Sequence, residues 1–154
     1  MQLIVGAGEA LAKLQKYGFK LILISNQSGI GRGYLTWQEL EEVHQRMVSL
    51  LSQYGVCLTG HYYCPHSPQE NCMCRKPSSQ MILRAADEFH LDVESSFMIG
   101  DTEVDMLAGR NAGCRTIYLS SGSNNSDSVV PADLVASNWF DVVQYILGKH
   151  ENIL

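Results

Sequence analysis

The chain has 154 residues, a length that suits one globular domain. Hydrophobic residues make up 45% and charged residues 18%, which excludes a disordered or fibrous protein. The formal net charge of −5 at pH 7 argues against a broad contact with nucleic acid or with an anionic membrane. We therefore expect a single domain over residues 1–154 with neither of these partners.

Helical and strand patterns alternate along the chain. Helices are expected over 7–17, 36–55, 79–90 and 101–113 and after residue 138, and strands over 20–25, 58–64, 97–100, 116–119 and 134–136. The stretch 120–132 is rich in Ser, Gly and Asn and predicts an exposed loop. This alternation predicts an α/β sandwich with a mainly parallel sheet that binds ligands at the carboxyl ends of its strands.

The helix over 36–55 has the clearest signals. Thr36 and Glu39 form a capping box at its start. Its apolar stripe consists of Leu40, Val43, Met47, Leu50 and Tyr54.

Cellular location is indicated by two absences. No apolar run approaches the ~20 residues of a membrane-spanning helix, and the first residues lack the pattern of a secretory signal. We expect a cytoplasmic protein. Three of the five cysteines crowd between positions 64 and 74, which is typical of metal chemistry rather than of a disulfide framework.

The loop over 64–74 carries a complete set of soft metal ligands. Its three thiols and one imidazole suit tetrahedral zinc, and they belong to Cys64, His66, Cys72 and Cys74. Four protein ligands leave no vacancy for water, so the predicted role is structural. The alternative is ordinary cysteines beside a surface histidine. The other two cysteines, Cys57 and Cys114, are interpreted as small buried apolar groups.

An acidic turn follows the strand over 97–100. Asp101 stands at its carboxyl end, and Asp105 lies one helical turn further along. Two such carboxylates suit Mg²⁺. The alternative for Asp101 is a helix N-cap.

Phosphate-binding groups are offered by two further segments. The hydroxyl of Ser25 and the backbone at Asn26 follow a strand and can hold phosphate oxygens, although a Ser-Asn turn is commonplace. Lys76 can neutralise a phosphoryl group, and Arg75 can grip phosphate or sugar. Solvated surface charge is the alternative for both cations.

Four motifs, at 25–29, 64–66, 72–77 and 100–105, together resemble the zinc-loop branch of the haloacid dehalogenase (HAD) phosphatases. The resemblance covers essentially the whole chain. It implies a HAD-like Rossmannoid three-layer sandwich that hydrolyses a sugar bisphosphate through an aspartyl-phosphate. Within the branch the chain looks most like the heptose bisphosphate phosphatases, with the histidinol-phosphate phosphatases as the alternative.

The resemblance also implies roles for single residues. Ser25, with the backbone of Asn26, would bind the transferring phosphoryl group, Lys76 would offset its charge and Arg75 would help to select the substrate. The metal ligands that it implies are Asp101 for Mg²⁺, with Asp105 supporting that site or orienting Lys76, and Cys64, His66, Cys72 and Cys74 for Zn²⁺. The family further implies a monomer that acts on a phosphorylated small molecule.

The family's nucleophile has no counterpart in the sequence. Family members begin with a strand ending in Asp-x-Asp, whose first aspartate attacks phosphorus and whose second is the general acid and base. The first aspartate here is Asp87, inside an expected helix. The nucleophile strand is therefore expected to be missing or replaced.

Three explanations are open. The sequence is incomplete, or it is a shortened and inactive product, or Gln2 to Val5 fills the vacant strand position. A non-catalytic remnant that binds a phosphosugar or a protein is the alternative from another functional class.

Overall fold

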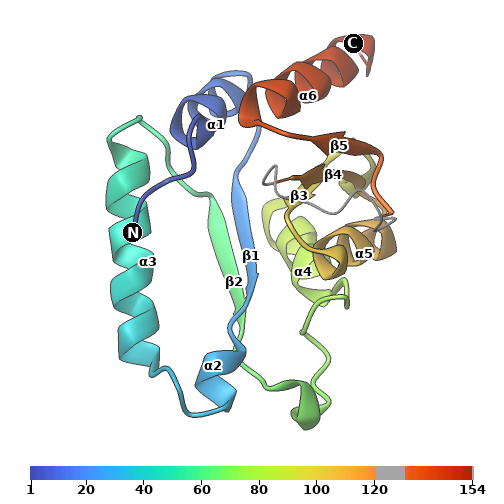
Figure 1. Ribbon diagram of the computed structural model, residues 1–154. Coiled ribbons are helices and arrows are strands. Elements are labelled where there is room, and N and C mark those ends of the chain that lie inside the picture. The colour runs from blue at the N-terminus through green and yellow to red at the C-terminus, as the bar shows by residue number, and fades with distance from the viewer. Residues whose placement is uncertain (121–130, 154) are drawn as a thin grey trace. The chain divides into compact units, whose positions relative to one another are not determined.

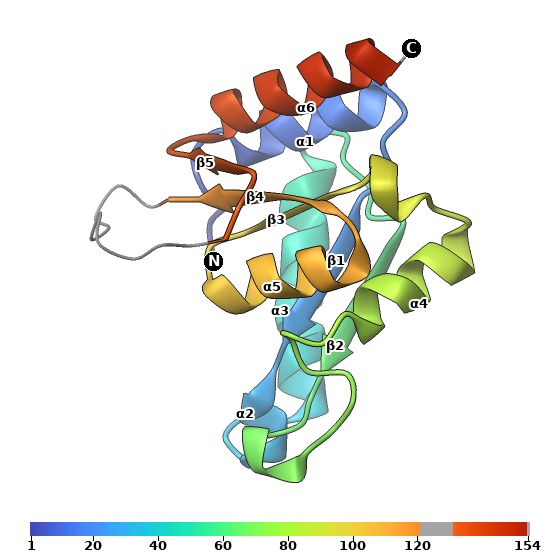
Figure 2. The same cartoon turned by 90° about the vertical axis from the view of Figure 1, so that its right-hand side faces the viewer.

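The computed structural model describes residues 1–120 and 131–153. The chain divides into two compact units, Met1–Arg75 and Lys76–Leu154, each built from helices and parallel strands (Figures 1 and 2). The expected α/β class is confirmed. The loop expected over 120–132 lies, except for its ends, outside the described residues.

The Met1–Arg75 unit contains a two-stranded sheet. Its elements are α1 (Ala7–Lys16), β1 (Ile22–Asn26), α2 (Ser28–Gly31), α3 (Trp37–Ser52), β2 (Gly60–Cys64) and the 3-10 turn η1 (Pro68–Glu70). β1 and β2 are parallel and in register from the Ile22–Gly60 pair to the Asn26–Cys64 pair. The polar residues that end the two strands therefore lie side by side.

The buried face of helix α3 agrees only in part with the one that its apolar pattern predicts. The Thr36 hydroxyl accepts a hydrogen bond from the Glu39 backbone at 3.1 Å, as expected of the cap. Of the expected stripe, Leu40 is buried and Met47 and Leu50 are half-buried. Val43 and Tyr54 are each 44% exposed, and His44 and Leu51 are buried in addition.

His44 explains this shift of the buried face. Its Nδ1 lies 2.7 Å from the hydroxyl oxygen of Tyr63, and its ring centroid lies 4.1 Å from that of His61, both on β2. A polar ring with a hydrogen-bond partner can be buried at low cost. Burial lowers the pKa of His44, and the neighbouring His61 lowers it further.

The Lys76–Leu154 unit contains a three-stranded sheet. Its elements are α4 (Gln80–Phe89), η2 (Val93–Ser95), β3 (Phe97–Gly100), α5 (Glu103–Ala112), β4 (Arg115–Leu119), β5 (Leu134–Ala136) and α6 (Trp139–Ile153). The strand order is β3-β4-β5, with every pair parallel. Figures 1 and 2 show α5 and α6 on opposite sides of this sheet, so the unit has three layers of its own.

The core of this unit requires a glycine in α5. Met106, Ile117 and Val142 are completely buried there. A β-carbon on Gly109 would lie 2.6 Å from Cβ of Met98 and 2.8 Å from Cγ2 of Thr116. Only glycine lets the helix approach β3 and β4 so closely.

Residues Gln2 to Val5 do not form a strand: 1–4 have no regular structure and Val5 begins a turn before α1. The idea that this segment replaces the nucleophile strand is therefore wrong. Instead of the one sheet expected, the described strands form two separate sheets.

Among the described residues, no helix is both long enough and apolar enough to cross a membrane.

We predict that Gly109→Ala lowers the free energy of unfolding by about 1–3 kcal/mol, because the new methyl group overpacks the contact with β3 and β4. Urea denaturation monitored by circular dichroism measures the change. Gly148→Ala is the matched control: it lies in α6 with no atom within 4 Å of its ideal Cβ, so the same substitution should stabilise by about 0.5–1 kcal/mol. Equal effects of the two substitutions would contradict the packing argument.

Candidate active site and metal centre

The first turn of α5 is organised around the carboxylate of Asp105, which is 5% exposed. Its Oδ2 accepts hydrogen bonds from the backbone N–H groups of Asp101 and Thr102, both at 3.2 Å. The Thr102 hydroxyl in turn accepts from the Asp105 backbone at 3.3 Å, which completes a capping box. Negative charge is also favoured at a helix N-terminus, so this carboxylate is held in one position.

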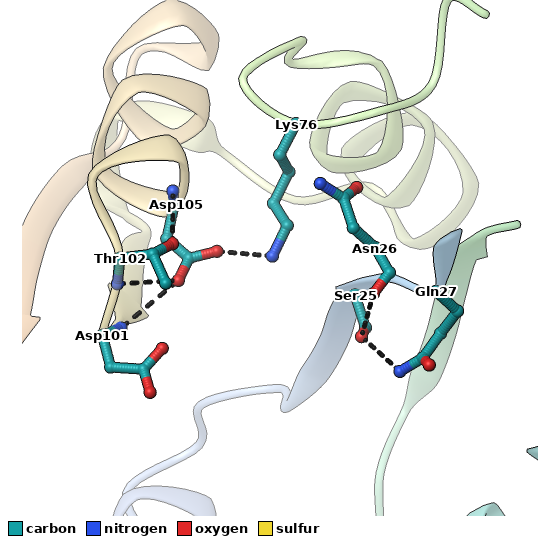
Figure 3. A network of polar contacts seen from close by, with 7 residues as sticks. All are labelled: Ser25, Asn26, Gln27, Lys76, Asp101, Thr102 and Asp105. Atoms are coloured by element: carbon teal, nitrogen blue, oxygen red, sulfur yellow. Dashed lines mark hydrogen bonds and ion pairs between the residues drawn. The ribbon is translucent and has the colours of Figure 1, made fainter. Parts of the chain in front are cut away.

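Lys76 forms an ion pair with the second oxygen of Asp105 (Figure 3). Lys76 is 9% exposed, and a cation so deeply buried requires a fixed anionic partner. Gly100 makes room for that partner, because a β-carbon there would lie 2.6 Å from the Asp105 carboxyl carbon. The result is an ammonium group held near the carboxyl end of β3.

Asp101 does not cap α5. The N-cap is Thr102, so the alternative role considered for Asp101 is wrong. Asp101 is exposed and contributes its backbone N–H to Asp105. Its carboxylate remains at the carboxyl end of β3, where a hard oxygen ligand for a cation was expected.

Ser25 and Asn26 are the last two residues of β1 and belong to the other unit. The side-chain Nε2 of Gln27 donates to the Ser25 hydroxyl oxygen at 2.9 Å (Figure 3). That hydroxyl donates to the Asn26 carbonyl at 3.4 Å, a long contact. Gln27 lies within the motif over 25–29, but the sequence predicted no separate role for it.

The four expected zinc ligands come together at the end of β2. The ligand atoms of Cys64, His66, Cys72 and Cys74 all lie within 4.8 Å of one another, so the group can hold a metal ion. Four of the separations are between 3.4 and 3.8 Å. Tetrahedral zinc with bonds of about 2.0–2.3 Å has ligand–ligand edges of roughly 3.3–3.8 Å, so the donor set fits that ion.

The thiols of this group differ in acidity. Burial, followed by hydrogen bonding with Cys74, raises the pKa of Cys64 to about 12. Burial opposes ionisation of Cys72 too, but hydrogen bonds with the Arg75 backbone and the neighbouring thiols outweigh it and lower the pKa to about 7. Metal binding displaces the thiol protons, so the affinity for metal should rise with pH.

The remaining residues singled out from the sequence lie as follows. Nη1 of Arg75 is buried and has no hydrogen-bond partner among the described residues, so the reading of Arg75 as a solvated surface charge is wrong for this atom. Cys57 is exposed, so its interpretation as a buried apolar group is also wrong. Cys114 is partly buried, and that burial raises its pKa to about 11.

Comparison with known proteins identifies the family. The HAD-hydrolase-like family model matches residues 73–141. A D-glycero-beta-D-manno-heptose-1,7-bisphosphate 7-phosphatase of Haemophilus ducreyi is 40% identical over 94% of this chain and 85% of its own length. The chain belongs to this heptose bisphosphate phosphatase family. A member from Helicobacter pylori is 51% identical over 70% of this chain and 62% of its own length.

Solved structures of the heptose bisphosphate phosphatase family share the fold. One from B. bronchiseptica, complexed with magnesium and phosphate, matches with a TM-score of 0.86 and 27% identity over 95% of this chain and 84% of its own. One from Burkholderia thailandensis, 23% identical, has a TM-score of 0.71 over 94% of this chain and 85% of its own, and supports the fold alone.

We predict that Asp105→Asn lowers the free energy of unfolding by about 3 kcal/mol, because it removes the anionic partner of a buried ammonium group. Chemical denaturation at neutral pH measures the loss. Asp87→Asn, at an exposed position of α4, makes the same chemical change and should stay within about 0.5 kcal/mol of the parent protein. If Asp105→Asn behaved like this control, the ion pair would contribute little to stability.

Proposed function

We propose that this chain provides the phosphoryl-binding and metal-binding part of a phosphatase that removes the 7-phosphate of D-glycero-beta-D-manno-heptose 1,7-bisphosphate. The reaction class and substrate are those in the names of the relatives described above. The structural observation that supports the proposal best is the buried Lys76–Asp105 ion pair at the carboxyl end of β3. That strand end is where α/β proteins bind ligands.

Lys76 has the central electrostatic role in this proposal. Phosphoryl transfer spreads negative charge over the phosphate oxygens, and catalysis comes mainly from positioning and neutralising that charge. A lysine fixed by Asp105 can do this without reorganising during the reaction. Asp105 is therefore a positioning residue that orients Lys76.

The further phosphate- and sugar-binding groups that we propose are Ser25, the backbone of Asn26 and Arg75. The Ser25 hydroxyl donates to a phosphoryl oxygen. The buried, unpaired Nη1 of Arg75 supports a role in gripping a phosphate or sugar oxygen, because a buried donor gains most from a new acceptor.

Asp101 is the proposed protein ligand for magnesium. Mg²⁺ is usually held by one or two carboxylates together with waters and substrate phosphate, so an exposed carboxylate beside the phosphate-binding lysine fits it in part. Bound there, the ion would neutralise further charge on the phosphoryl group. Asp105 already interacts with Lys76 and with two backbone N–H groups, so its proposed part is to hold the backbone of Asp101 in place.

Turnover needs a nucleophile that residues 1–154 do not offer in the family's form. The first aspartate in the chain is Asp87, in α4. The names of the relatives favour the heptose bisphosphate over histidinol phosphate as the ligand. We propose further that the protein acts as a cytoplasmic monomer.

Zinc is the metal that we propose for the four-ligand group. Its closed donor set suits a structural ion that holds the loop between β2 and Lys76. We predict about one zinc per chain after purification without chelator, measured by elemental analysis. Cys72→Ser should remove most of it, whereas Cys57→Ser, at an exposed position outside the group, should leave it unchanged. Equal zinc in both variants would contradict the assignment.

The catalytic proposal is tested by adding the nucleophile. We predict that fusing an apolar strand ending in Asp-x-Asp ahead of Met1 yields a protein that releases the 7-phosphate of heptose 1,7-bisphosphate in the presence of Mg²⁺. A phosphate-release assay measures the rate, and the matched control has Asn in place of the first Asp of the added motif. Asp101→Asn in the extended protein should also lose activity.

Two results would contradict this proposal. Phosphate release that is equal with Asp or Asn in the added motif would exclude the proposed nucleophile. Faster hydrolysis of histidinol phosphate than of the heptose bisphosphate would overturn the proposed substrate assignment.

The chain of 154 residues should itself bind phosphate with no turnover.

A further inference from the structure

We propose that Gln27 is a positioning residue that makes the Ser25 hydroxyl a hydrogen-bond donor toward a phosphoryl oxygen. The loop with the metal ligands holds Gln27 in place through the carbonyl of Cys64. This inference rests on the proposed role of Ser25. It adds Gln27 to the proposed binding groups and states that the Ser25 hydroxyl is the donor.

The argument starts from the hydrogen-bonding capacity of a hydroxyl group. Ser25 Oγ has one proton to donate and two lone pairs that accept, whereas a phosphoryl oxygen only accepts. Gln27 Nε2 donates to Oγ at 2.9 Å, as the dashed line in Figure 3 shows. With an acceptor site of Oγ filled in this way, its proton is directed to another acceptor.

The present acceptor of that proton is easily exchanged. The proton is donated to the Asn26 carbonyl oxygen at 3.4 Å, well beyond the usual O–H···O range of about 2.5–3.0 Å. A phosphoryl oxygen at normal distance would form a charge-assisted bond, which is about twice as strong as a neutral one. Ser25 is therefore prepared to donate to an anion.

Gln27 is fixed by the backbone of the segment that carries the metal ligands. Its own N–H donates to the Cys64 carbonyl at 2.7 Å, and the N–H of Gly31 donates to the Pro65 carbonyl at 2.8 Å. A β-carbon on Gly31 would lie 2.7 Å from the Ser67 backbone nitrogen, so the two segments meet backbone to backbone. The position of the metal loop therefore sets the position of Gln27, and Gln27 in turn sets the orientation of the Ser25 hydroxyl.

Gln27→Glu tests the direction of this hydrogen bond. Glutamate has nearly the same shape but, when ionised, can only accept, so the Ser25 proton would turn to it instead of to the ligand. We expect inorganic phosphate to bind at least about tenfold more weakly at pH 7.5. Titration of the ¹⁵N-labelled protein followed by amide chemical shifts measures the affinity even when binding is weak.

A double-mutant cycle separates this effect from simple charge repulsion. Without the hydroxyl, in a Ser25→Ala background, Gln27→Glu should change the affinity for phosphate by no more than about twofold. Repulsion between the new carboxylate and phosphate would instead give equal factors in both backgrounds. Gln38→Glu, at an exposed position in the first turn of α3, adds the same charge and should leave phosphate binding unchanged.

The outcomes distinguish the inference from the function on which it rests. If Ser25→Ala binds phosphate as tightly as the parent protein, the proposed role of Ser25 fails, and the role of Gln27 fails with it. If Ser25→Ala weakens binding but Gln27→Glu has no effect, or has equal effects in both backgrounds, only the inference about Gln27 is overturned.

The link to the metal loop has its own measurement. Removing metal from the protein with a chelator should shift the side-chain amide resonance of Gln27 and weaken phosphate binding. Both changes should reverse when zinc is added back. An unchanged Gln27 resonance in metal-free protein would show that the loop does not position this residue.

Discussion

A buried ammonium group requires a fixed negative partner, and the Lys76–Leu154 unit is built around that requirement at the carboxyl end of β3. The Asp105 carboxylate can serve only if the first turn of α5 presents two backbone N–H groups to it and Thr102 caps the helix. Gly100 is equally necessary, because any side chain there would collide with the carboxylate. One charge pair therefore accounts for the residue types at several neighbouring positions.

In the Met1–Arg75 unit the constraint is different. A polar loop there has little apolar surface of its own and needs another source of order. Four soft ligands converge at the end of β2 and can close that loop around a metal ion. Because the carbonyls of Cys64 and Pro65 accept hydrogen bonds from Gln27 and Gly31, the order extends to the end of β1. A structural metal would then influence ligand binding without contacting the ligand.

Patterns confined to one element were read correctly from the sequence. The strand over 97–100 and the Thr36 cap depend on local runs and capping chemistry, and both occur in the structure. The buried face of α3 was predicted only in part, because apolar periodicity does not show that His44 has a partner in Tyr63, nineteen residues further along the chain. The contact between His44 and Tyr63, which are distant in sequence, therefore determines part of the buried face of α3.

At the site too, features that depend on residues close in sequence were predicted, and features that depend on distant contacts were not. The cysteine spacing predicted a cluster that the structure assembles, because its ligands are close in sequence. The N-cap of α5 was uncertain because Asp101 and Thr102 are both good capping residues, and the structure selects Thr102. The motif over 25–29 contains Gln27 but does not predict its proposed role, which depends on a rotamer and on the Cys64 carbonyl.

Phosphoryl transfer divides into two requirements, the binding and neutralising of charge and the supply of an attacking carboxylate. In our proposal Lys76, Ser25 and Asp101 address the first, and residues 1–154 contain no Asp-x-Asp motif for the second. The described strands form two sheets, β1-β2 and β3-β4-β5. Ser25 lies near the end of β1 in the first sheet, and Asp101 follows β3 in the second. The groups proposed for the first requirement therefore stand at strand ends of both sheets.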